Sequence, residues 1–269
     1  MTETLWENPP FYEHTLRRLL SKNILNTDTG ILVVCGGEGD RVAFQSLGFK
    51  NVTISNLDTN LSSSKMSPFQ WSYQNAEELT FPDDSFDFCV VHEGLHHCYS
   101  PHRGLLEMYR VSRFGLLLIE PCDNVFTKLG LVLDIGQEYE HSAVFYHDCK
   151  SGGVANSSVP NFIYRWTEKE IVKTISSFSP YGKHRFLFWR RLMMPWRNLA
   201  NRRSALIRLL YPVFLLLELG DSVTSRMGNT LASVVLKPEI PRDVHPWLRL
   251  SEGEFEPDIH YLTGKFREK

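Results

Sequence analysis

The chain has 269 residues, of which 42% are hydrophobic and 22% charged, a composition typical of a soluble protein with one domain and an insertion, or with two small domains. Its five cysteines are odd in number and lack C-x-x-C spacing, which argues against a disulfide framework or a cysteine-rich zinc site and indicates a reducing, cytoplasmic compartment. No signal peptide is predicted at the N-terminus, and the longest apolar run, Leu209 to Leu217, is too short to span a bilayer.

The formal net charge of −2 conceals an uneven distribution of charge along the chain. Residues 171–217 contain two lysines, seven arginines and no acidic residue. Such a basic stretch predicts either a surface for an anionic partner or a helix face in contact with water. No RNA- or DNA-binding motif surrounds it, so a nucleic-acid partner is not expected.

The first half of the chain alternates between predicted helices and predicted strands. Residues 1–27 form an N-terminal segment with helical spacing of apolar positions over 11–25, and a short apolar run at 31–35 predicts a strand buried on both faces. A helix follows at 41–49. Further strands are predicted at 51–56, 70–74, 86–91 and 115–120, with a helix at 104–111 between the last two. This alternation indicates βαβ units and a parallel sheet.

The second half begins with a capping box, in which Thr167 is followed by Glu170, and this predicts a helix at 166–178. Two more strands are predicted at 184–189 and 229–237, which would complete a main domain over 28–237. Residues 190–228, between these strands, predict an insertion of one or two helices. The tail, 238–269, shows little periodicity, so we expect it to wrap the surface or to be partly disordered.

A glycine-rich turn, Gly36-Gly37-Glu38-Gly39, stands between the first strand and the helix that follows it. Glycines let the backbone approach a ligand closely, and the N–H groups of the turn and of the helix N-terminus receive polar ligand groups. A glycine turn can also serve only to reverse the chain. The turn alone therefore gives two alternatives, a ligand-binding loop or a structural turn.

Residues 76–121 carry a series of motifs in a characteristic order. An Asn75-Ala76 pair precedes a leucine, an F-P-x-D-S-F-D run, an L-H-H turn, an E-x-x-R-V helix and a strand ending in E-P. In this order and spacing the stretch resembles the middle of a small-molecule class I methyltransferase that uses S-adenosylmethionine. The resemblance implies a doubly wound, Rossmann-like α/β fold with a seven-stranded, mostly parallel sheet. It covers residues 28–121 closely and the strand outline to residue 237 loosely.

The resemblance implies that the cofactor lies beyond the carboxyl ends of the first four strands, where ligands bind in open α/β sheets. The first strand end would hold the methionine portion, the second the ribose hydroxyls, and the third the adenine edge. The fourth would lie beneath the methionine and the reacting methyl group. The implied cofactor-binding residues are Cys35, Gly36, Gly37, Gly39, Asn56, Asp58, Asn75, Ala76, His92 and Glu93.

Three residues depart from the family pattern. Val33 stands where an acidic residue is usual, Cys35 replaces the first glycine of the turn, and Asn56 replaces the acidic residue that ends the second strand. A carboxylate accepts ribose hydroxyl hydrogen bonds better than an amide does, and Asp58 offers a replacement two residues later. The alternative to an enzyme is a methyltransferase-like protein that binds or scaffolds without catalysis.

A competing motif overlaps the fourth strand end, because His92, Glu93 and His96 fit the H-E-x-x-H pattern of zinc hydrolases. That chemistry needs a helix that places both imidazoles on one face. Here a strand is predicted to run directly into His92. The zinc hydrolase therefore remains a remote alternative, and no metal site is predicted.

Methyl transfer from a sulfonium needs orientation and, for a hydroxyl acceptor, a base. His97 follows the fourth strand and is the first candidate for that base, with Glu120 at the end of the fifth strand as a second. The alternative is that His97 is a structural turn residue. The expected partner is a small-molecule acceptor, anionic or linked to a lipid, whose identity the sequence does not give.

The insertion at 190–228 adds a further hypothesis. The strand that precedes the insertion should end on the cofactor side of a parallel sheet, so the insertion should begin beside the cofactor. The insertion carries six arginines before the apolar run: Arg190, Arg191, Arg197, Arg202, Arg203 and Arg208. Arginines beside an apolar segment are typical of a substrate lid or of a helix in peripheral contact with a membrane. The alternative is a helical hairpin that packs its leucines on the sheet.

Overall fold

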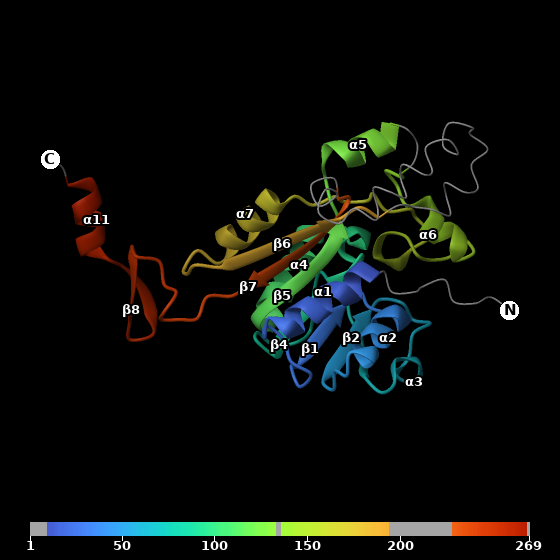
Figure 1. Ribbon diagram of the computed structural model, residues 1–269, viewed down its shortest axis with the longest axis horizontal. Coiled ribbons are helices and arrows are strands. Elements are labelled where there is room, and N and C mark those ends of the chain that lie inside the picture. The colour runs from blue at the N-terminus through green and yellow to red at the C-terminus, as the bar shows by residue number, and fades with distance from the viewer. Residues whose placement is uncertain (1–9, 133–135, 194–227, 268–269) are drawn as a thin grey trace.

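The computed structural model of the protein describes residues 10–132, 136–193 and 228–267 (Figure 1). Its centre is a seven-stranded sheet in the order β3-β2-β1-β4-β5-β7-β6. All strand pairs are parallel except the two that β7 makes, with β5 and with β6. The strands are β1 (Ile31–Val34), β2 (Val52–Asn56), β3 (Gln70–Tyr73), β4 (Phe86–His92), β5 (Ser112–Pro121), β6 (Arg185–Arg191) and β7 (Thr230–Leu236). The predicted doubly wound, mostly parallel sheet is confirmed.

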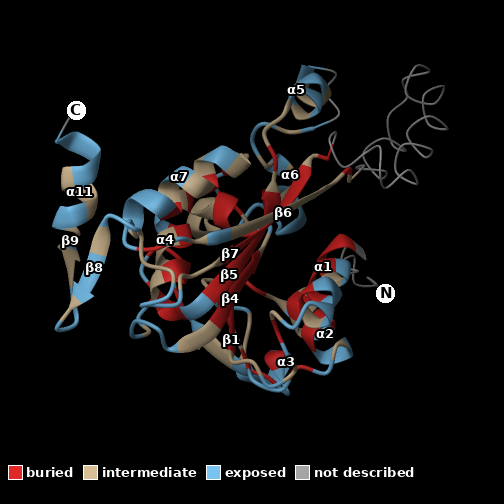
Figure 2. Cartoon of the chain, turned by 60° about the vertical axis from the view of Figure 1, so that its left-hand side comes forward, coloured by how far each residue is buried: buried red, intermediate tan, exposed pale blue. Residues whose placement is uncertain are grey.

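The central strands are buried on both faces, as their uninterrupted apolar sequences predict (Figure 2). Successive side chains of a strand point to opposite faces, so each strand contributes to two core clusters. In β1, Ile31 and Val33 belong to one cluster, and Leu32 and Val34 belong to the other. The sheet therefore separates two cores, each of which needs a layer of helices.

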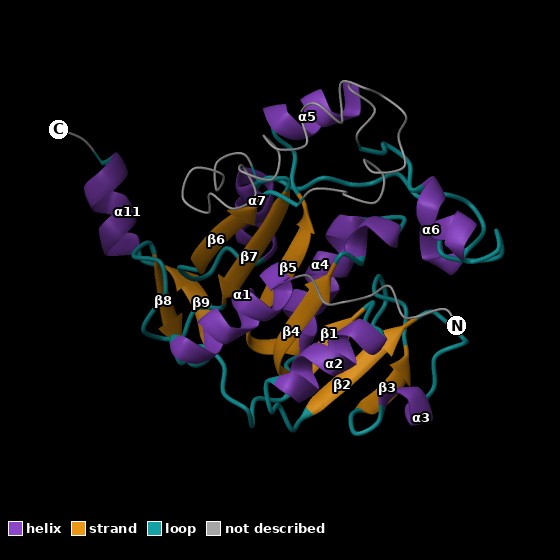
Figure 3. Ribbon diagram, turned by 45° about the vertical axis from the view of Figure 1, so that its right-hand side comes forward, coloured by secondary structure: helices purple, strands orange, loops and turns teal. Residues whose placement is uncertain are grey.

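Helices cover both faces of the sheet (Figure 3). The helices α1 (Pro10–Ser21) and α2 (Glu38–Ser46) contribute apolar residues to the first core, and α4 (Pro101–Val111) and α7 (Glu168–Phe178) contribute to the second. The short α3 (Ser63–Met66) buries Met66 in the first core. The predicted capping box of α7 is present, since the Thr167 hydroxyl accepts from Glu170 N at 3.2 Å and the Glu170 carboxylate accepts from Thr167 N at 3.4 Å.

Short helical segments follow the carboxyl ends of β4 and β5. They are the single-turn η1 (Leu95–His97), α5 (Val125–Val132), α6 (His141–Tyr146) and the single-turn η2 (Val154–Asn156). Because the connection from β5 to α7 is long, it brings residues such as Glu140 and Asn161 back to the end of β4. This connection supplies side chains to the candidate site.

The strand β6 is parallel to β5, because both pair antiparallel with β7, and it ends at the same edge of the sheet, as predicted. It extends through Arg190 and Arg191, which pair with Leu231 and Thr230. Both arginines therefore belong to β6 and not to the insertion predicted at 190–228, because β7 is long enough to pair with them. Residues 194–227 of the predicted insertion, with the remaining arginines and the apolar run, lie outside the described residues.

The tail has more regular structure than we expected. It forms a hairpin, β8 (Leu248–Ser251) with β9 (Glu254–Pro257), and a final helix, α11 (Ile259–Phe266). The expectation failed because the two-residue turn, Glu252-Gly253, adopts positive φ at both positions (53° and 89°), the conformation that favours tight hairpins. Hairpin and helix lie to one side of the sheet (Figure 1). Tyr181 and Phe255, whose ring centroids are 4.7 Å apart, form one contact between the two parts.

Among the described helices, none combines the length and the apolar character needed to cross a membrane.

Candidate functional site

Hydrogen bonds join the loops that follow β1, β2 and β3. The amide of Gly36 donates to Ser55 O at 2.9 Å, and Asn56 Nδ2 donates to Gly36 O at 3.0 Å. Gln74 N in turn donates to Asn56 O at 3.1 Å. The structure therefore brings three of the four predicted cofactor loops together at one edge of the sheet.

The glycine turn after β1 has one packed position and one open position. A Cβ on Gly36 would lie 2.6 Å from Val33 Cγ1, so this position requires glycine. A Cβ on Gly37 would meet no atom within 4 Å, and Gly37 is the N-cap of α2. The backbone of Gly37 therefore borders open space at the N-terminus of a helix, where polar ligand groups bind favourably.

Two buried side chains that the sequence analysis did not single out support this turn. Tyr12 Oη donates to Asp40 Oδ1, and Gly37 N donates to Asp40 Oδ2, both at 2.9 Å. The Tyr12 ring also stacks on His92, with centroids 4.3 Å apart and 17° between the planes. Burial raises the pKa of Asp40, although the nearby His92 opposes this. Helix α1 is thereby fixed against both the glycine turn and the end of β4.

At the end of β2, the side chains of Asn56 and Asp58 form hydrogen bonds with neighbouring residues and with the glycine turn. Asn56 Nδ2 donates to Gly36 O, and Asn56 Oδ1 accepts from Asp58 N at 3.1 Å. Asp58 Oδ1 accepts from the backbone and side-chain nitrogens of Asn60, both at 2.9 Å. Both polar atoms of the Asn56 amide are therefore engaged, whereas the second carboxylate oxygen of Asp58 has no hydrogen-bond partner among the described residues.

The loop after β3 is held against the segment that follows β4. Asn75 Oδ1 accepts from Glu77 N at 3.1 Å, and Ala76 is 4% exposed. The carboxylate of Glu77 accepts from the backbone amides of Tyr99 and Ser100, both at 2.9 Å. Glu77 thus fixes the distance between the loop after β3 and the start of α4.

The turn after β4 lies directly against the glycine turn. A Cβ on Gly94 would lie 2.4 Å from Cys35 Cβ. Cys35 and Glu93 both have positive φ, 56° and 50°, and Glu93 N donates to Ile119 O at 2.8 Å. The four predicted loops therefore meet, and η1 begins directly after the residue of the β4 turn that contacts Cys35.

The residues of the H-E-x-x-H pattern do not share a helix face. The strand β4 ends at His92, and η1 is a single turn from Leu95 to His97. His92 stacks on Tyr12, whereas His96 Nδ1 lies 2.7 Å from Glu120 Oε2. The zinc-hydrolase alternative is wrong, because a strand and a tight turn point these histidines at different partners.

Glu120 is buried in a structural role that the sequence analysis did not anticipate. Its side chain is 1% exposed, and Oε1 accepts from the amides of Gly94 and Leu95 at 2.8 and 2.7 Å. Its other oxygen contacts His96 Nδ1. All of these contacts hold η1 in place, so Glu120 positions the turn and does not present a free carboxylate to an acceptor.

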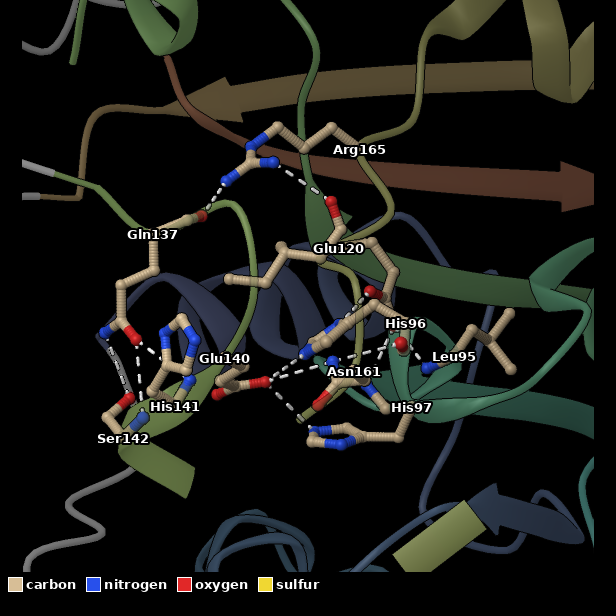
Figure 4. A network of polar contacts seen from close by, with 12 residues as sticks. Leu95, His96, His97, Glu120, Gln137, Glu140, His141, Ser142, Asn161 and Arg165 are labelled. Carbon is tan, nitrogen blue, oxygen red and sulfur yellow. Dashed lines mark hydrogen bonds and ion pairs between the residues drawn. The ribbon is translucent and has the colours of Figure 1, made fainter. Parts of the chain in front are cut away.

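His96, His97 and Glu140 form a polar cluster over the end of β4 (Figure 4). The Nε2 atoms of His96 and His97 lie 3.3 and 3.4 Å from Glu140 Oε2. Burial lowers the pKa of His96, but Glu120 and Glu140 outweigh it and raise the pKa to about 10. Burial and the charge of His96 lower the pKa of His97, which is therefore neutral at neutral pH. Burial would raise the pKa of Glu140, but the hydrogen bond to His96 and the charge of His96 outweigh burial and lower that pKa to about 2.

Residues 33–119 match the sequence profile of a family described as methyltransferase domain. The chain carries a class I methyltransferase domain. S-adenosylmethionine is the cofactor of this family. The match covers the glycine turn, the ends of β2 to β4 and β5 as far as Ile119, the residue before Glu120.

Solved structures with the same fold have low sequence identity to the methyltransferase domain. The YcgJ protein of Bacillus subtilis is 13% identical at a TM-score of 0.52, with 84% of this chain and 99% of that chain covered. A proposed methyltransferase of Haloferax volcanii, solved with the Trm112 activator, is 12% identical at a TM-score of 0.52, with 84% and 89% covered. A proposed methyltransferase of Anabaena variabilis is 13% identical at 0.50, with 87% and 100% covered. No curated protein matches the chain. These likenesses show the fold.

Sequence reasoning missed the side chains that support the methyltransferase site from a distance. They are Tyr12, Asp40, Glu77, Glu140 and Asn161. Asp40 had a local signal, since it stands three residues after the N-cap of α2, where a carboxylate reaches back to the cap. Glu140 and Asn161 had none, because they lie in a connection without periodicity.

Proposed function

We propose that this methyltransferase transfers the methyl group of S-adenosylmethionine to an oxygen or nitrogen of a small-molecule acceptor, with His97 acting on the acceptor nucleophile. The observation that carries the proposal is the contact between the turn after β4 and the glycine turn, where a Cβ on Gly94 would lie 2.4 Å from Cys35 Cβ. A methyl donor bound at the glycine turn would lie beside η1, which carries His97.

The predicted cofactor-binding residues remain proposals. The geometry of the site supports the assignment of each loop to one part of the cofactor. The backbone of Cys35, Gly36, Gly37 and Gly39 would receive the methionine portion, since Gly37 borders open space. Asp58 would accept from the ribose, and the loop of Asn75 and Ala76 would line the adenine. His92 and Glu93 would form the floor beneath the methionine. S-adenosylmethionine supplies a methyl group already activated on a sulfonium, so the protein has to orient the acceptor and receive its proton.

His97 meets the requirements for contact with an acceptor. Its side chain is 28% exposed, so a ligand can reach it, whereas Glu120 is 1% exposed. The lowered pKa keeps the imidazole neutral at neutral pH, and a neutral imidazole can accept a proton. His97 would then receive, on a ring nitrogen, the proton that the acceptor loses when it takes up the methyl group supplied by S-adenosylmethionine.

The acceptor's charge is proposed from the sequence. Residues 171–217 carry nine basic side chains and no acidic ones, which favours an anionic or lipid-linked acceptor. Pairs of acceptors that differ only in a phosphate or carboxylate group would test this, and equal KM values for both members would contradict it.

The central experiment uses methyl-tritiated S-adenosylmethionine and a low-molecular-weight extract as the acceptor pool. Wild-type protein is expected to label a small molecule. His97→Asn should lower the rate by about 100-fold or more, the range for loss of a proton-transfer group, without changing the Kd for S-adenosylhomocysteine. Label found only in protein or nucleic acid, or an unchanged rate in the variant, would contradict the proposal.

A further inference from the structure

Three potential metal ligands converge on one point from two separate segments. His96 and His97 are adjacent on η1, and Glu140 is the N-cap of α6. One ligand atom from each side chain lies within 4.8 Å of the other two (Figure 4). Among the described residues, these three side chains form the group whose ligand atoms lie close enough together to hold one metal ion.

The spacing of these atoms fits a tetrahedral metal ion. Nitrogen and oxygen ligands at about 2.0–2.1 Å from Zn²⁺ lie about 3.3–3.4 Å from one another in tetrahedral geometry. The Nε2 atoms of His96 and His97 are 3.3 and 3.4 Å from Glu140 Oε2. Two edges of the tetrahedron are therefore already in place.

A buried carboxylate orients the first ligand. Glu120 Oε2 lies 2.7 Å from His96 Nδ1, and Glu120 itself is fixed by the amides of Gly94 and Leu95. Metal-binding histidines commonly donate their other ring N–H to a carboxylate, which sets the tautomer and the ring orientation. Glu120 fixes His96 in this way, with Nε2 directed at Glu140.

A second buried side chain holds Glu140. Asn161 is 2% exposed, and its Nδ2 donates to Glu140 Oε2 at 3.3 Å and to His96 O at 3.1 Å. Asn161 Oδ1 is buried and has no hydrogen-bond partner among the described residues. The amide lies beside Glu140 and His97 (Figure 4), so its unpaired oxygen is available to a group bound at the cluster.

We propose that His96 Nε2, His97 Nε2 and Glu140 Oε2 bind one divalent transition metal ion, with Zn²⁺ as the best match. Two imidazoles and a carboxylate suit Zn²⁺ and disfavour Mg²⁺, which prefers oxygen ligands. Three protein ligands leave a fourth position open, as in catalytic zinc sites. This departs from the sequence analysis, which predicted no metal site, because Glu140 lies 43 residues from His97 in a segment without a motif.

The catalytic part of this inference deepens the proposed function and rests on it. An acceptor oxygen at the open position would bind the metal directly, and the metal's charge would lower the pKa of that oxygen's proton. Because its Nε2 would then be a metal ligand, His97 would act on the acceptor through the metal and would not itself take the proton, which would pass to solvent. Since Glu140 and His97 are 23% and 28% exposed, solvent and a small ligand can reach the ion.

Cobalt provides a direct readout. Full-length protein freed of metal with a chelator is titrated with Co²⁺, and separately with Zn²⁺ and with Mg²⁺ by calorimetry. We expect one site per chain, visible absorption bands of tetrahedral Co²⁺, displacement of Co²⁺ by Zn²⁺ and no response to Mg²⁺. His97→Ala and Glu140→Gln should each weaken Co²⁺ binding by at least about 100-fold. His102→Gln is the matched control, because His102 pairs with Glu170 outside the cluster, and it should bind as wild type does.

The variants are checked for folding by their affinity for S-adenosylhomocysteine. Wild-type protein without the tetrahedral bands, or unchanged Co²⁺ affinity in both cluster variants, would show that these side chains form an ion pair only and would overturn the metal site. Because the titration needs no acceptor, it separates the two proposals. Bands lost in both variants of a protein that transfers no methyl group would support the metal site and count against the proposed function alone.

Discussion

Three residues that depart from the methyltransferase pattern have local reasons in the structure. Val33 is buried in the first core and lies against the position where a Gly36 Cβ would be. Cys35 adopts positive φ, and the absence of a side chain on Gly94 makes room for it. Asn56 donates to Gly36 O, which a carboxylate could not do. The departures therefore tie the loops to each other.

Replacing Gly37 by valine tests the assigned cofactor loop. A Cβ there meets no protein atom within 4 Å, so the fold should tolerate the larger side chain, which would occupy the space of the ligand. We expect binding of S-adenosylhomocysteine to be lost while the melting temperature changes little. Gly264→Val is the matched control, because that glycine, on α11, also borders open space. Calorimetry that gives equal affinities for the Gly37 variant and wild type would refute the assignment, and absent binding in wild type would favour the non-catalytic alternative.

Asp58 has one carboxylate oxygen without a hydrogen-bond partner among the described residues, whereas both polar atoms of the Asn56 amide are hydrogen-bonded. If Asp58 accepts from the ribose, Asp58→Ala should weaken cofactor binding by roughly 1.5–3 kcal/mol, the scale of a hydrogen bond to a charged group. Asn56→Ala should weaken binding less and lower thermal stability more, because both of its amide atoms bond within the protein. The two Kd values and melting temperatures decide this. The opposite order of affinities would assign the ribose contact to Asn56.

At the scale of elements, a few buried side chains fix the helices and turns around the site. Tyr12 joins α1 to α2 and β4, Glu77 joins the end of β3 to the start of α4, and Glu120 joins β5 to η1. Each of these side chains is buried and contacts more than one partner. The site is thus held by contacts between elements rather than by the geometry of any one loop.

His184 makes a comparable contact between α4 and the start of β6. Its Nε2 lies 2.7 Å from the hydroxyl of Tyr109, and burial lowers its pKa from 6.5 to about 4. Because the folded state then binds the proton more weakly than the unfolded state, this histidine's contribution to stability is complete above pH 6.5 and declines as the pH falls towards 4. We expect the melting temperature of wild type to fall over this window and that of His184→Gln to fall less. His260→Gln, an exposed position on α11, is the control. Parallel pH dependence in wild type and His184→Gln would rule out this histidine as the cause.

At the scale of the whole molecule, the chain divides into a sheet domain and a C-terminal hairpin with its helix. The sheet domain ends with β7 at Leu236, two residues before the start of the predicted tail at 238. The tail approaches the domain near Tyr181 and Gly182, which precede β6 and therefore lie at the edge opposite its carboxyl end. The tail is thus placed away from the loops that form the site.

Deletion of residues 246–269 tests this placement. The truncated protein should keep its affinity for S-adenosylhomocysteine within about twofold of wild type, since the loops after β1 to β4 are unchanged. Its melting temperature should fall by a few degrees, because the contact of Tyr181 with Phe255 is lost. The full-length Phe255→Ala variant shows how much of that fall the ring contact explains. A large loss of cofactor affinity in the truncated protein would place the tail at the site.

The sequence by itself determined the sheet, the order of its elements and the edge at which the site lies. Uninterrupted apolar runs at Ile31–Val34 and over residues 88–91 can be buried only between two helical layers, and glycine turns and capping residues act over a few neighbouring positions. These signals are local, so they can be recognised without knowing the fold. The tight turn of the tail, Glu252-Gly253, is a local signal of the same kind.

Only the tertiary structure decided which polar side chains meet. Glu120 looked like a free carboxylate and proved to be bonded to two backbone amides and to His96, whereas Glu140 had no motif and lies beside both histidines. A carboxylate's role depends on its partners and its burial, and both come from segments far apart in the chain. Periodicity and spacing describe neighbours along one segment, so they cannot report a contact that forms only when β4, β5 and the connection after β5 pack together.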